Sequence, residues 1–253
     1  MMGVTVLSAV FYKNESLFAT LKDSCNRMGL ESVLYGVGQR FPGFYRAKVV
    51  ALLEAIRDVK TDHVLFCDGR DSLVLGDEQA ILAAYKNVCK ASKGKIVFCA
   101  DRKCFPYPEL ASGFEERGEG HEASVCLWKG AATRRVFLNA GVFMAETGYL
   151  RKCLGRLMCL YEQEADSVAK PKDDQGWWCM AIDRGLVKVA IDYKCELVAM
   201  TTYTPDKWYG FRKGKCSFRP THTEPCVLHF AGRKDTKRRM PRFLEGMGLD
   251  GGS

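Results

Sequence analysis

The stretch VLFCDGRDSLVL (residues 64–75) decides how the chain is organised. A short apolar run ends abruptly in Asp68 and Asp71, and apolar residues then resume. This pattern predicts a buried strand with two carboxylates at its carboxyl end, which is where ligands bind in open α/β sheets. Two acids at i and i+3 across a tight turn can converge on a hard divalent cation such as Mg²⁺ or Mn²⁺. An ordinary acidic turn after a strand is the alternative interpretation.

Strand and helix patterns alternate along the rest of the chain. Apolar runs predict strands at residues 4–11, 32–37, 95–100, 136–144, 187–197 and 227–230. Helical spacing of apolar residues predicts helices at 15–28, 46–59, 78–90, 150–164 and 176–184. This alternation indicates an α/β fold with a mainly parallel sheet flanked by helices. We expect a long loop at 101–130 and an irregular region at 201–225.

The composition limits the classes of protein to consider. With 253 residues and 47% hydrophobic content, the chain can bury a large core. No apolar run approaches the roughly 20 residues that span a bilayer, and residues 4–11 resemble a first strand rather than a signal peptide. The 12 cysteines include no CxxC pair. We therefore expect mostly buried free thiols in a reducing compartment, the cytoplasm, or the host cytoplasm for a viral protein.

Four further segments carry polar groups that could act on a ligand. Gly36 to Gly43 form a glycine-rich loop, which Lys48 follows, and Asn139-Ala140-Gly141 interrupts an apolar strand. Asp173-Asp174-Gln175 precedes a predicted helix, where Asp173 could equally be the N-cap. A short apolar strand then delivers His229, followed by Gly232, Arg233 and Lys234. A histidine of this kind is either structural or a metal ligand, and the two cations suit a neighbouring diphosphate.

The order of these segments resembles the glycosyltransferase domain of the procollagen lysyl hydroxylases and, more broadly, the metal-dependent sugar transferases of the GT-A fold, including glycogenin-like enzymes. The likeness runs from about residue 4 to residue 234. It implies one GT-A-like (Rossmann-like) domain at 1–240 and a C-terminal tail at 241–253. By position, it implies that Asp68, Asp71 and His229 are metal ligands and that Asn139, in FLNAG, lies at the donor site. Cys104-Phe105-Pro106 is similar to a CWP element of the family's acceptor-side loop.

The chain departs from the family at several positions. Arg70 stands where the lysyl hydroxylase domains have an aromatic residue between the two aspartates, which affects the stacking of uracil. Phe105 replaces the tryptophan of CWP. The HxxGxxK pattern of glycogenin-like enzymes is one residue shorter here, because Lys234 is only two residues after Gly232. No room remains for the oxygenase domain of the collagen enzymes, so we expect a free-standing transferase.

The resemblance implies retaining transfer of a hexose from a UDP-sugar, with Mn²⁺ or Mg²⁺ neutralising charge on the departing diphosphate. Asp173 and Asp174 would orient the sugar or stabilise positive charge at its reacting carbon, and Asn139 would assist. The donor-binding residues implied are Lys48, Arg70, Asn139, Gln175, Gly232, Arg233 and Lys234.

Charge is the main indication of the acceptor. Of the net charge of +8, residues 201–253 contribute eleven Lys or Arg against five acids. A concentrated positive field attracts phosphate, although a solvated basic tail is the alternative. We expect a 5-hydroxymethylated base in DNA, as in viruses and bacteriophages that glycosylate their genomes. Phe105, Trp208 and Tyr209, with Phe211, would hold the extruded base. A hydroxylysine acceptor, a sugar-nucleotide hydrolase, and a catalytically inactive nucleotide-sugar or nucleic-acid binding module remain alternatives.

Overall fold

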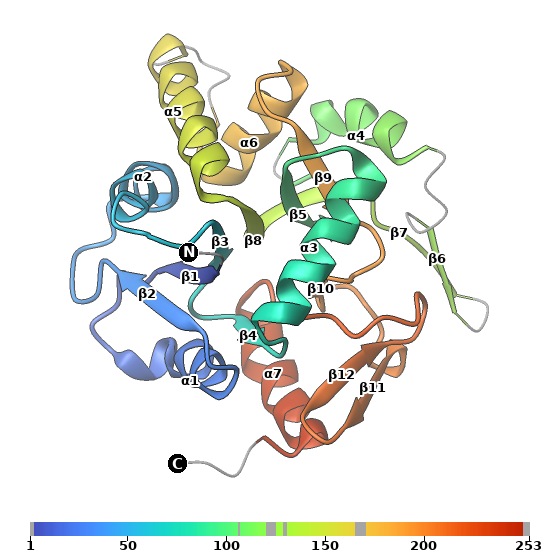
Figure 1. Cartoon of the computed structure of the whole chain (residues 1–253). Helices are drawn as coiled ribbons and strands as arrows, with labels where there is room; N and C mark the ends of the chain where they lie inside the picture. Colours follow the sequence, from blue (N-terminus) through green and yellow to red (C-terminus); the bar gives the residue numbers. More distant parts are fainter. Residues whose placement is uncertain (1–2, 106, 120–124, 129–130, 165–170, 250–253) are drawn as a thin grey trace.

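The computed structural model describes residues 3–105, 107–119, 125–128, 131–164 and 171–249. Its centre is a six-stranded sheet in the order β2-β1-β3-β8-β5-β9 (Figure 1). The strands are β1 (Val4–Ala9), β2 (Glu31–Tyr35), β3 (His63–Cys67), β5 (Ile96–Asp101), β8 (Phe137–Glu146) and β9 (Val189–Asp192). All but β8 run in one direction, because β8 pairs antiparallel with both β3 and β5. The predicted α/β fold with a mainly parallel sheet is confirmed.

Both faces of this sheet are covered by helices, because successive side chains of each strand point to opposite faces. Phe66 and Phe98 face a core that includes residues of helices α2 (Ala51–Ala55), α5 (Thr147–Gln163) and α6 (Asp174–Asp183). Their neighbours Leu65 and Val97 face a second core, built with helices α1 (Ala19–Arg27) and α3 (Glu78–Ser92). Burial on both faces explains why these strands are continuous apolar runs.

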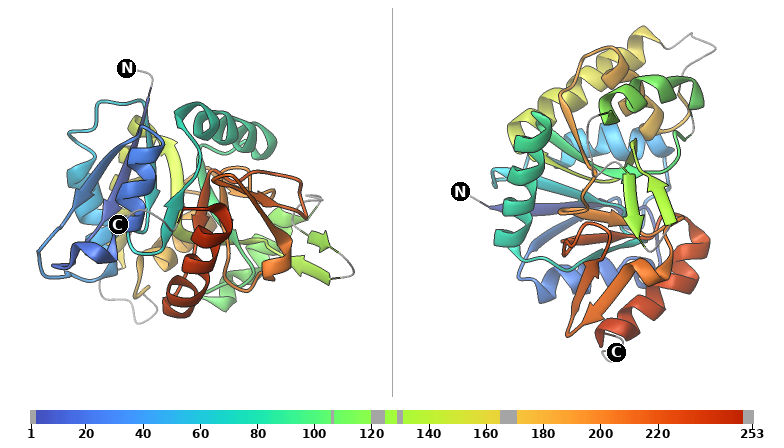
Figure 2. Two further views of the ribbon diagram at one scale, coloured as in Figure 1. Left: turned by 90° about the horizontal axis from the view of Figure 1, so that it is seen from below. Right: turned by 90° about the vertical axis from the view of Figure 1, so that its right-hand side faces the viewer.

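A smaller sheet lies beside the main one, in the order β10-β13-β4. It contains β10 (Val198–Met200), β13 (Val227–His229) and β4 (Ser72–Val74), with His229 paired to Ser72. Helix α7 (Arg233–Met247) and the hairpin of β11 (Tyr209–Arg212) and β12 (Lys215–Phe218) pack with it in a third core, at one end of the molecule (Figure 2). The pairing of β4 with β13 brings the chain just after Asp71 beside His229.

The predicted buried strand is present as β3, which ends just before Asp68, and the apolar residues that resume after Asp71 lie in a second sheet as β4. Other expectations about local structure need correction. The predicted strand 187–197 contains only β9 and then a turn before β10. The expected loop at 101–130 contains helix α4 (Ala111–Gly118) and β6 (Val125–Trp128), which pairs with β7 (Ala131–Arg134). Residues 106, 120–124 and 129–130 of that loop lie outside the described part.

The C-terminal region is more ordered than its irregular sequence indicates. Within 201–225, the hairpin β11–β12 presents aromatic side chains to helix α7, where Phe243 contacts the rings of Tyr209 and Phe211. Phe243 and Met247 are buried, so the packing continues past residue 240, where we placed the beginning of the tail.

The composition led us to expect free thiols and no membrane-spanning segment. Eleven described cysteines are free thiols, eight of them buried, as their scattered positions predicted. Among the described residues, no helix combines the length and apolar character needed to cross a membrane.

Candidate active site

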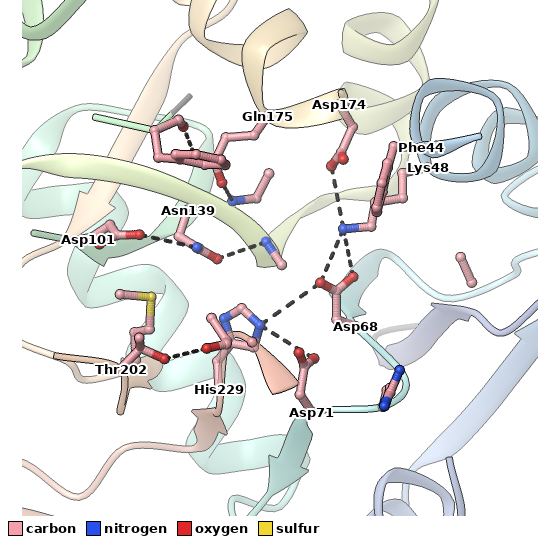
Figure 3. A pocket seen from close by; sticks show the side chains of 18 of the residues that line it. Phe44, Lys48, Asp68, Asp71, Asp101, Asn139, Asp174, Gln175, Thr202 and His229 are labelled. Carbon is pink, nitrogen blue, oxygen red and sulfur yellow. Dashed lines mark hydrogen bonds and ion pairs between the residues drawn. The ribbon is translucent and has the colours of Figure 1, made fainter. Parts of the chain in front are cut away.

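A pocket of about 870 Å³ opens where β1, β3, β5 and β13 end (Figure 3). Ala9, Asp68, Asp101 and His229 line it, each at or next to the carboxyl end of one of these strands. This is the edge at which α/β sheets bind ligands. The pocket also includes ten of the residues proposed from the sequence: Lys48, Asp68, Arg70, Asp71, Phe105, Asn139, Asp174, Gln175, His229 and Gly232.

Three of these residues form the expected metal-ligand cluster. Asp68, Asp71 and His229 each offer one ligand atom, and these atoms lie within 4.8 Å of one another. His229 Nε2 is 3.5 Å from Asp71 Oδ1 and 3.9 Å from Asp68 Oδ2. The two aspartates flank the turn after β3, and His229 ends β13 in the smaller sheet.

The cluster holds buried polar atoms that lack hydrogen bonds in the described structure. These atoms are Asp71 Oδ1 and both ring nitrogens of His229, whose side chain is 2% exposed. Unsatisfied buried polar atoms are costly, so a group that they could bind is expected. Two carboxylates and an imidazole nitrogen suit Mn²⁺ or Mg²⁺, and a cation placed among them would satisfy Asp71 Oδ1 and one ring nitrogen of His229. The residues present therefore fit a divalent metal.

Lys48 joins this cluster to a third carboxylate, that of Asp174. Its ammonium lies 2.8 Å from Asp68 Oδ1 and 3.6 Å from Asp174 Oδ2. It projects from a π-helical turn, Arg46–Val50, a local geometry that is frequent at functional sites. Burial opposes the charge on Lys48, but Asp174 and Asp68 outweigh it and raise its pKa.

The carboxyl groups around Lys48 are hard to ionise because they are buried. Burial raises the pKa of Asp174 to about 6, although Lys48 counteracts this. Burial also raises the pKa of Asp68, again against the effect of Lys48. Burial lowers the pKa of His229, but Asp71 and Asp68 outweigh it, so that pKa is raised overall. A bound cation would reverse the balance by favouring carboxylate and neutral imidazole.

A hydrogen-bond network fixes the opposite wall. Asn139 Nδ2 donates to Asp101 Oδ2 at 3.3 Å, and Asn139 Oδ1 accepts from the Gly141 amide at 3.0 Å. Gln175 Oε1 accepts from the Ala140 amide at 2.9 Å. The register of β5 against β8 shifts between Phe98 and Cys99, so β8 bulges at this segment. The segment that interrupts the apolar strand is therefore a bulge, and it turns Asn139 toward Asp101.

The other proposed residues divide into three groups. Arg70, Gly232 and Phe105 line the pocket. Asp173 acts as the N-cap of α6, accepting from the Gly176 amide at 2.8 Å, which is the alternative we gave for it. The backbone places Arg233 and Lys234 in the first turn of α7, and their side chains lie outside the described part, as does Pro106.

The proposed acceptor role of Trp208 and Tyr209 needs correction. Trp208 is 0% and Tyr209 3% exposed, and both belong to the core beneath the β11–β12 hairpin. A ring enclosed in this way has no free face on which a base could stack.

Several residues of the pocket were missed. Asp101 ends the buried strand β5 just as Asp68 follows β3, so the same pattern could have identified it. Phe41 of the glycine-rich loop, Phe44 directly after that loop and Tyr203 after β10 are large exposed aromatics that line the pocket. Phe41 and Tyr203 lie in irregular segments, so no periodicity marks them.

Solved structures with a similar fold are glycosyltransferases. One is a glycosyltransferase involved in the glycosylation of the major capsid of PBCV-1, at 12% identity over 93% of this chain and 96% of that chain, with a TM-score of 0.50. Another is an active-site mutant of LgtC, at 16% identity over 97% of this chain and 95% of that chain, with a TM-score of 0.51. No curated protein matches the sequence.

The fold and the site define a glycosyltransferase of the GT-A type that uses a nucleotide sugar. A family model for the PLOD GT domain, the glycosyltransferase domain of the lysyl hydroxylases, matches residues 3–242. The chain belongs to this family, and the resemblance inferred from the sequence is confirmed.

Proposed function

We propose that the protein transfers a hexose from a UDP-sugar to a hydroxyl group, with retention of configuration and with Mn²⁺ or Mg²⁺ held by Asp68, Asp71 and His229. The observation that carries this proposal is the cluster of these side chains, with its unsatisfied buried atoms. When bound, the metal supplies positive charge against the diphosphate leaving group.

The chain's own residues have distinct roles in this reaction. Lys48, which pairs with both Asp68 and Asp174, stands between the proposed metal site and the sugar side of the pocket. There Asp174 supplies negative charge near the reacting carbon, as carboxylates do for oxocarbenium-like states. Asn139 and Gln175 fix the position of the bulge in β8. Asn139 is also placed to orient a sugar hydroxyl, because an amide both donates and accepts.

In the proposed step, the bond between C1 of the hexose and the β-phosphate oxygen breaks, and its electron pair remains on that oxygen. The acceptor oxygen bonds to C1 on the same face, and the acceptor proton passes to the departing phosphate. UDP and the glycosylated acceptor are the products. The family resemblance is what supports retention.

For the acceptor we propose a 5-hydroxymethylated base in DNA. The basic residues of 201–253 support it, but structural pairing reduces their contribution. Lys215 pairs with Glu224, and Arg239 and Arg242 pair with Asp206. A hydroxylysine side chain is the second candidate, favoured by membership of the family of lysyl hydroxylase glycosyltransferase domains.

One screen tests both halves of the proposal. Purified protein is incubated with Mn²⁺ and UDP-glucose, UDP-galactose or other nucleotide sugars, alone, with 5-hydroxymethylcytosine DNA, or with a hydroxylysine peptide. We expect UDP release that rises with the modified DNA. If UDP release rises with the peptide instead, hydroxylysine becomes the acceptor. No release with any donor would contradict the reaction and favour a binding module.

The matched control separates metal chemistry from general damage. Asp71→Ala removes one proposed ligand, and Asp23→Ala removes an exposed carboxylate on α1. We expect only Asp71→Ala to abolish metal-dependent release, while both variants keep the circular dichroism spectrum of the parent. Normal release by Asp71→Ala would exclude the metal assignment.

A further inference from the structure

One wall of the pocket combines exposed aromatic rings with positive charge. We call it the acceptor wall and define it as three residues that line the pocket, Lys103 and Phe105 after β5 and Tyr203 after β10, together with Arg102, which lies beside the pocket lining and hydrogen-bonds to Tyr203. Phe105 is 66% and Tyr203 53% exposed. Arg102 Nη1 donates to Tyr203 O at 2.8 Å, and Lys103 Nζ lies 4.5 Å from the centre of the Tyr203 ring. The two segments are therefore fixed to each other.

Tyr203 has a backbone conformation that aromatic residues rarely adopt. Its φ is 62°, in the left-handed region that favours glycine. Such a conformation persists only when its surroundings enforce it, and it is typical of binding sites. Here the hydroxyls on either side enforce it, because Thr202 Oγ1 donates to Ala231 O at 2.7 Å and Thr204 Oγ1 to Met200 O at 3.2 Å. Because Tyr203 is exposed, packing in the core does not explain why an aromatic ring occupies this unfavourable backbone position. A contact between the ring and a bound ligand explains it better.

The charges around the pocket favour an anionic acceptor. Asp68 and Asp71 belong to the proposed metal site, and Asp174 pairs with Lys48. Asp101 accepts from Asn139 and from the backbone amides of residues 102 and 103. Within the described structure, neither Arg102 nor Lys103 forms an ion pair with a carboxylate. An acceptor that carries an ammonium group would therefore meet cations here, while each carboxylate of the described pocket lining belongs to the proposed metal site, pairs with Lys48 or accepts hydrogen bonds.

We infer that the acceptor wall binds a nucleotide unit of a polynucleotide, with its base stacked on Tyr203 or Phe105 and its flanking phosphate on Lys103 or Arg102. Flat rings interleaved with cations are what single-stranded or extruded nucleotides require. The inference rests on the proposed function, since it concerns the acceptor of that same site. It moves nucleic-acid recognition from Trp208 and Tyr209, which are buried, to the mouth of the pocket.

The test measures DNA binding without a donor sugar. Fluorescence anisotropy of a labelled single-stranded oligonucleotide gives Kd for the parent, Tyr203→Gly, Lys103→Gln and Lys95→Gln. Glycine relieves the positive φ, so Tyr203→Gly removes the ring without adding strain. Lys95→Gln is the matched control, because Lys95 lies 5.6 Å from the Tyr149 ring in a similar pair that does not line the pocket.

We expect Tyr203→Gly to weaken binding by about fivefold or more, the lower end of what a stacked base contributes. Lys103→Gln should weaken binding and reduce the slope of log Kd against log salt by about one phosphate contact, with Lys95→Gln close to the parent. Equal Kd values for the parent and the two wall variants would overturn the inference, as would binding of a hydroxylysine peptide that these variants weaken.

Hydrolysis of UDP-sugar by the parent protein, run in parallel, keeps the two hypotheses apart. Donor hydrolysis without DNA binding would leave the proposed donor chemistry intact and exclude the polynucleotide. Wall-dependent DNA binding without UDP release from any donor, with or without 5-hydroxymethylcytosine DNA, would support the acceptor wall and contradict the proposed reaction.

Discussion

Gly141 is in direct contact with His229: a Cβ added to Gly141 would lie 2.2 Å from His229 Cε1 and 2.5 Å from Nε2. It would also lie 2.9 Å from Asp68 Oδ2. The imidazole of His229 packs on the glycine of the FLNAG segment, so any larger residue there would clash with it. Strand β8 therefore supports the candidate metal site.

Gly141→Ala should displace His229 and weaken Mn²⁺ binding, with an overpacking cost of about 1–3 kcal/mol in the free energy of unfolding. Titration calorimetry and denaturant unfolding measure the two effects. Gly155→Ala is the control, because that helical glycine has no atom within 4 Å of an added Cβ. It should stabilise the protein by about 0.8–1 kcal/mol. Unchanged Mn²⁺ affinity in Gly141→Ala would contradict the assignment of His229 as a ligand.

Metal removal should lower stability, because a ligand that binds only the native state stabilises it by mass action. At a free Mn²⁺ concentration about 100 times Kd, we expect an increase of about 2.7 kcal/mol in the free energy of unfolding. Chelation with EDTA should remove this increase, and Asp71→Ala should never show it. Thermal unfolding with and without Mn²⁺ provides the measurement, and an equal metal-induced rise in Tm in Asp71→Ala would place the ion elsewhere.

Activity should fall as the pH drops below about 6. Burial raises the pKa of Asp174 to that value, and the proposed role of Asp174 requires the ionised form. Lys48→Met should move this acid limb to higher pH, because the ammonium of Lys48 lowers the pKa of Asp174. The pH profile of kcat measures both effects, and an unshifted limb in Lys48→Met would show that another group controls it.

Protonation of Asp174, which should lower activity, should raise the free energy of unfolding. Its pKa in the folded state lies above the ordinary 3.8, so the folded state binds the proton more tightly. Its contribution to the free energy of unfolding is complete below pH 3.8 and is lost as the pH rises through about 6. Asp174→Asn should therefore lessen the fall in stability over that window, which urea unfolding at several pH values would detect.

Asp101→Ala should impair turnover although we assign Asp101 no direct part in the chemistry. Without its carboxylate, Asn139 loses one partner and the amides of residues 102 and 103 lose theirs. A misplacement of about 1 Å at a reacting group can cost about a hundredfold in rate. We expect a loss mainly in kcat, with partial rescue by Asp101→Asn, which can still accept a hydrogen bond. Full activity in Asp101→Ala would show that Asn139 does not depend on it.

Trp208→Ala should destabilise the whole fold rather than weaken acceptor binding selectively. Removing a buried tryptophan costs about 3–5 kcal/mol because it leaves a cavity. Urea unfolding of Trp208→Ala should show this loss, while any folded fraction should bind DNA with the Kd of the parent. A stable Trp208→Ala variant with weakened DNA binding would instead support a role for Trp208 in binding the acceptor.

The convergence of the residues of the proposed metal site could be predicted from the sequence, because strand ends are local signals. Asp68, Asp71 and His229 each follow a short apolar run, and the carboxyl ends of such strands face one pocket. Asp101 obeys the same pattern and was missed only because the residues after it were treated as one long loop.

The burial of Trp208 and Tyr209 could not be predicted in this way. It depends on contacts with helix α7, far along the chain, and the segment around these residues has no periodic pattern to reveal a buried face. The separation of β4 from β3 is similar, since only the pairing of β4 with β13 shows that a second sheet exists.

The division of the proposed metal ligands between two sheets has a consequence for protein synthesis. As the chain leaves the ribosome, β3 and the Asp68 that follows it emerge long before β13, which carries His229, and β4 can pair with β13 only after residue 229 has been made. A nascent chain could therefore form much of the main sheet while it offers a cation only two carboxylates. Tight metal binding would then report that synthesis has passed His229 and that the second sheet has closed.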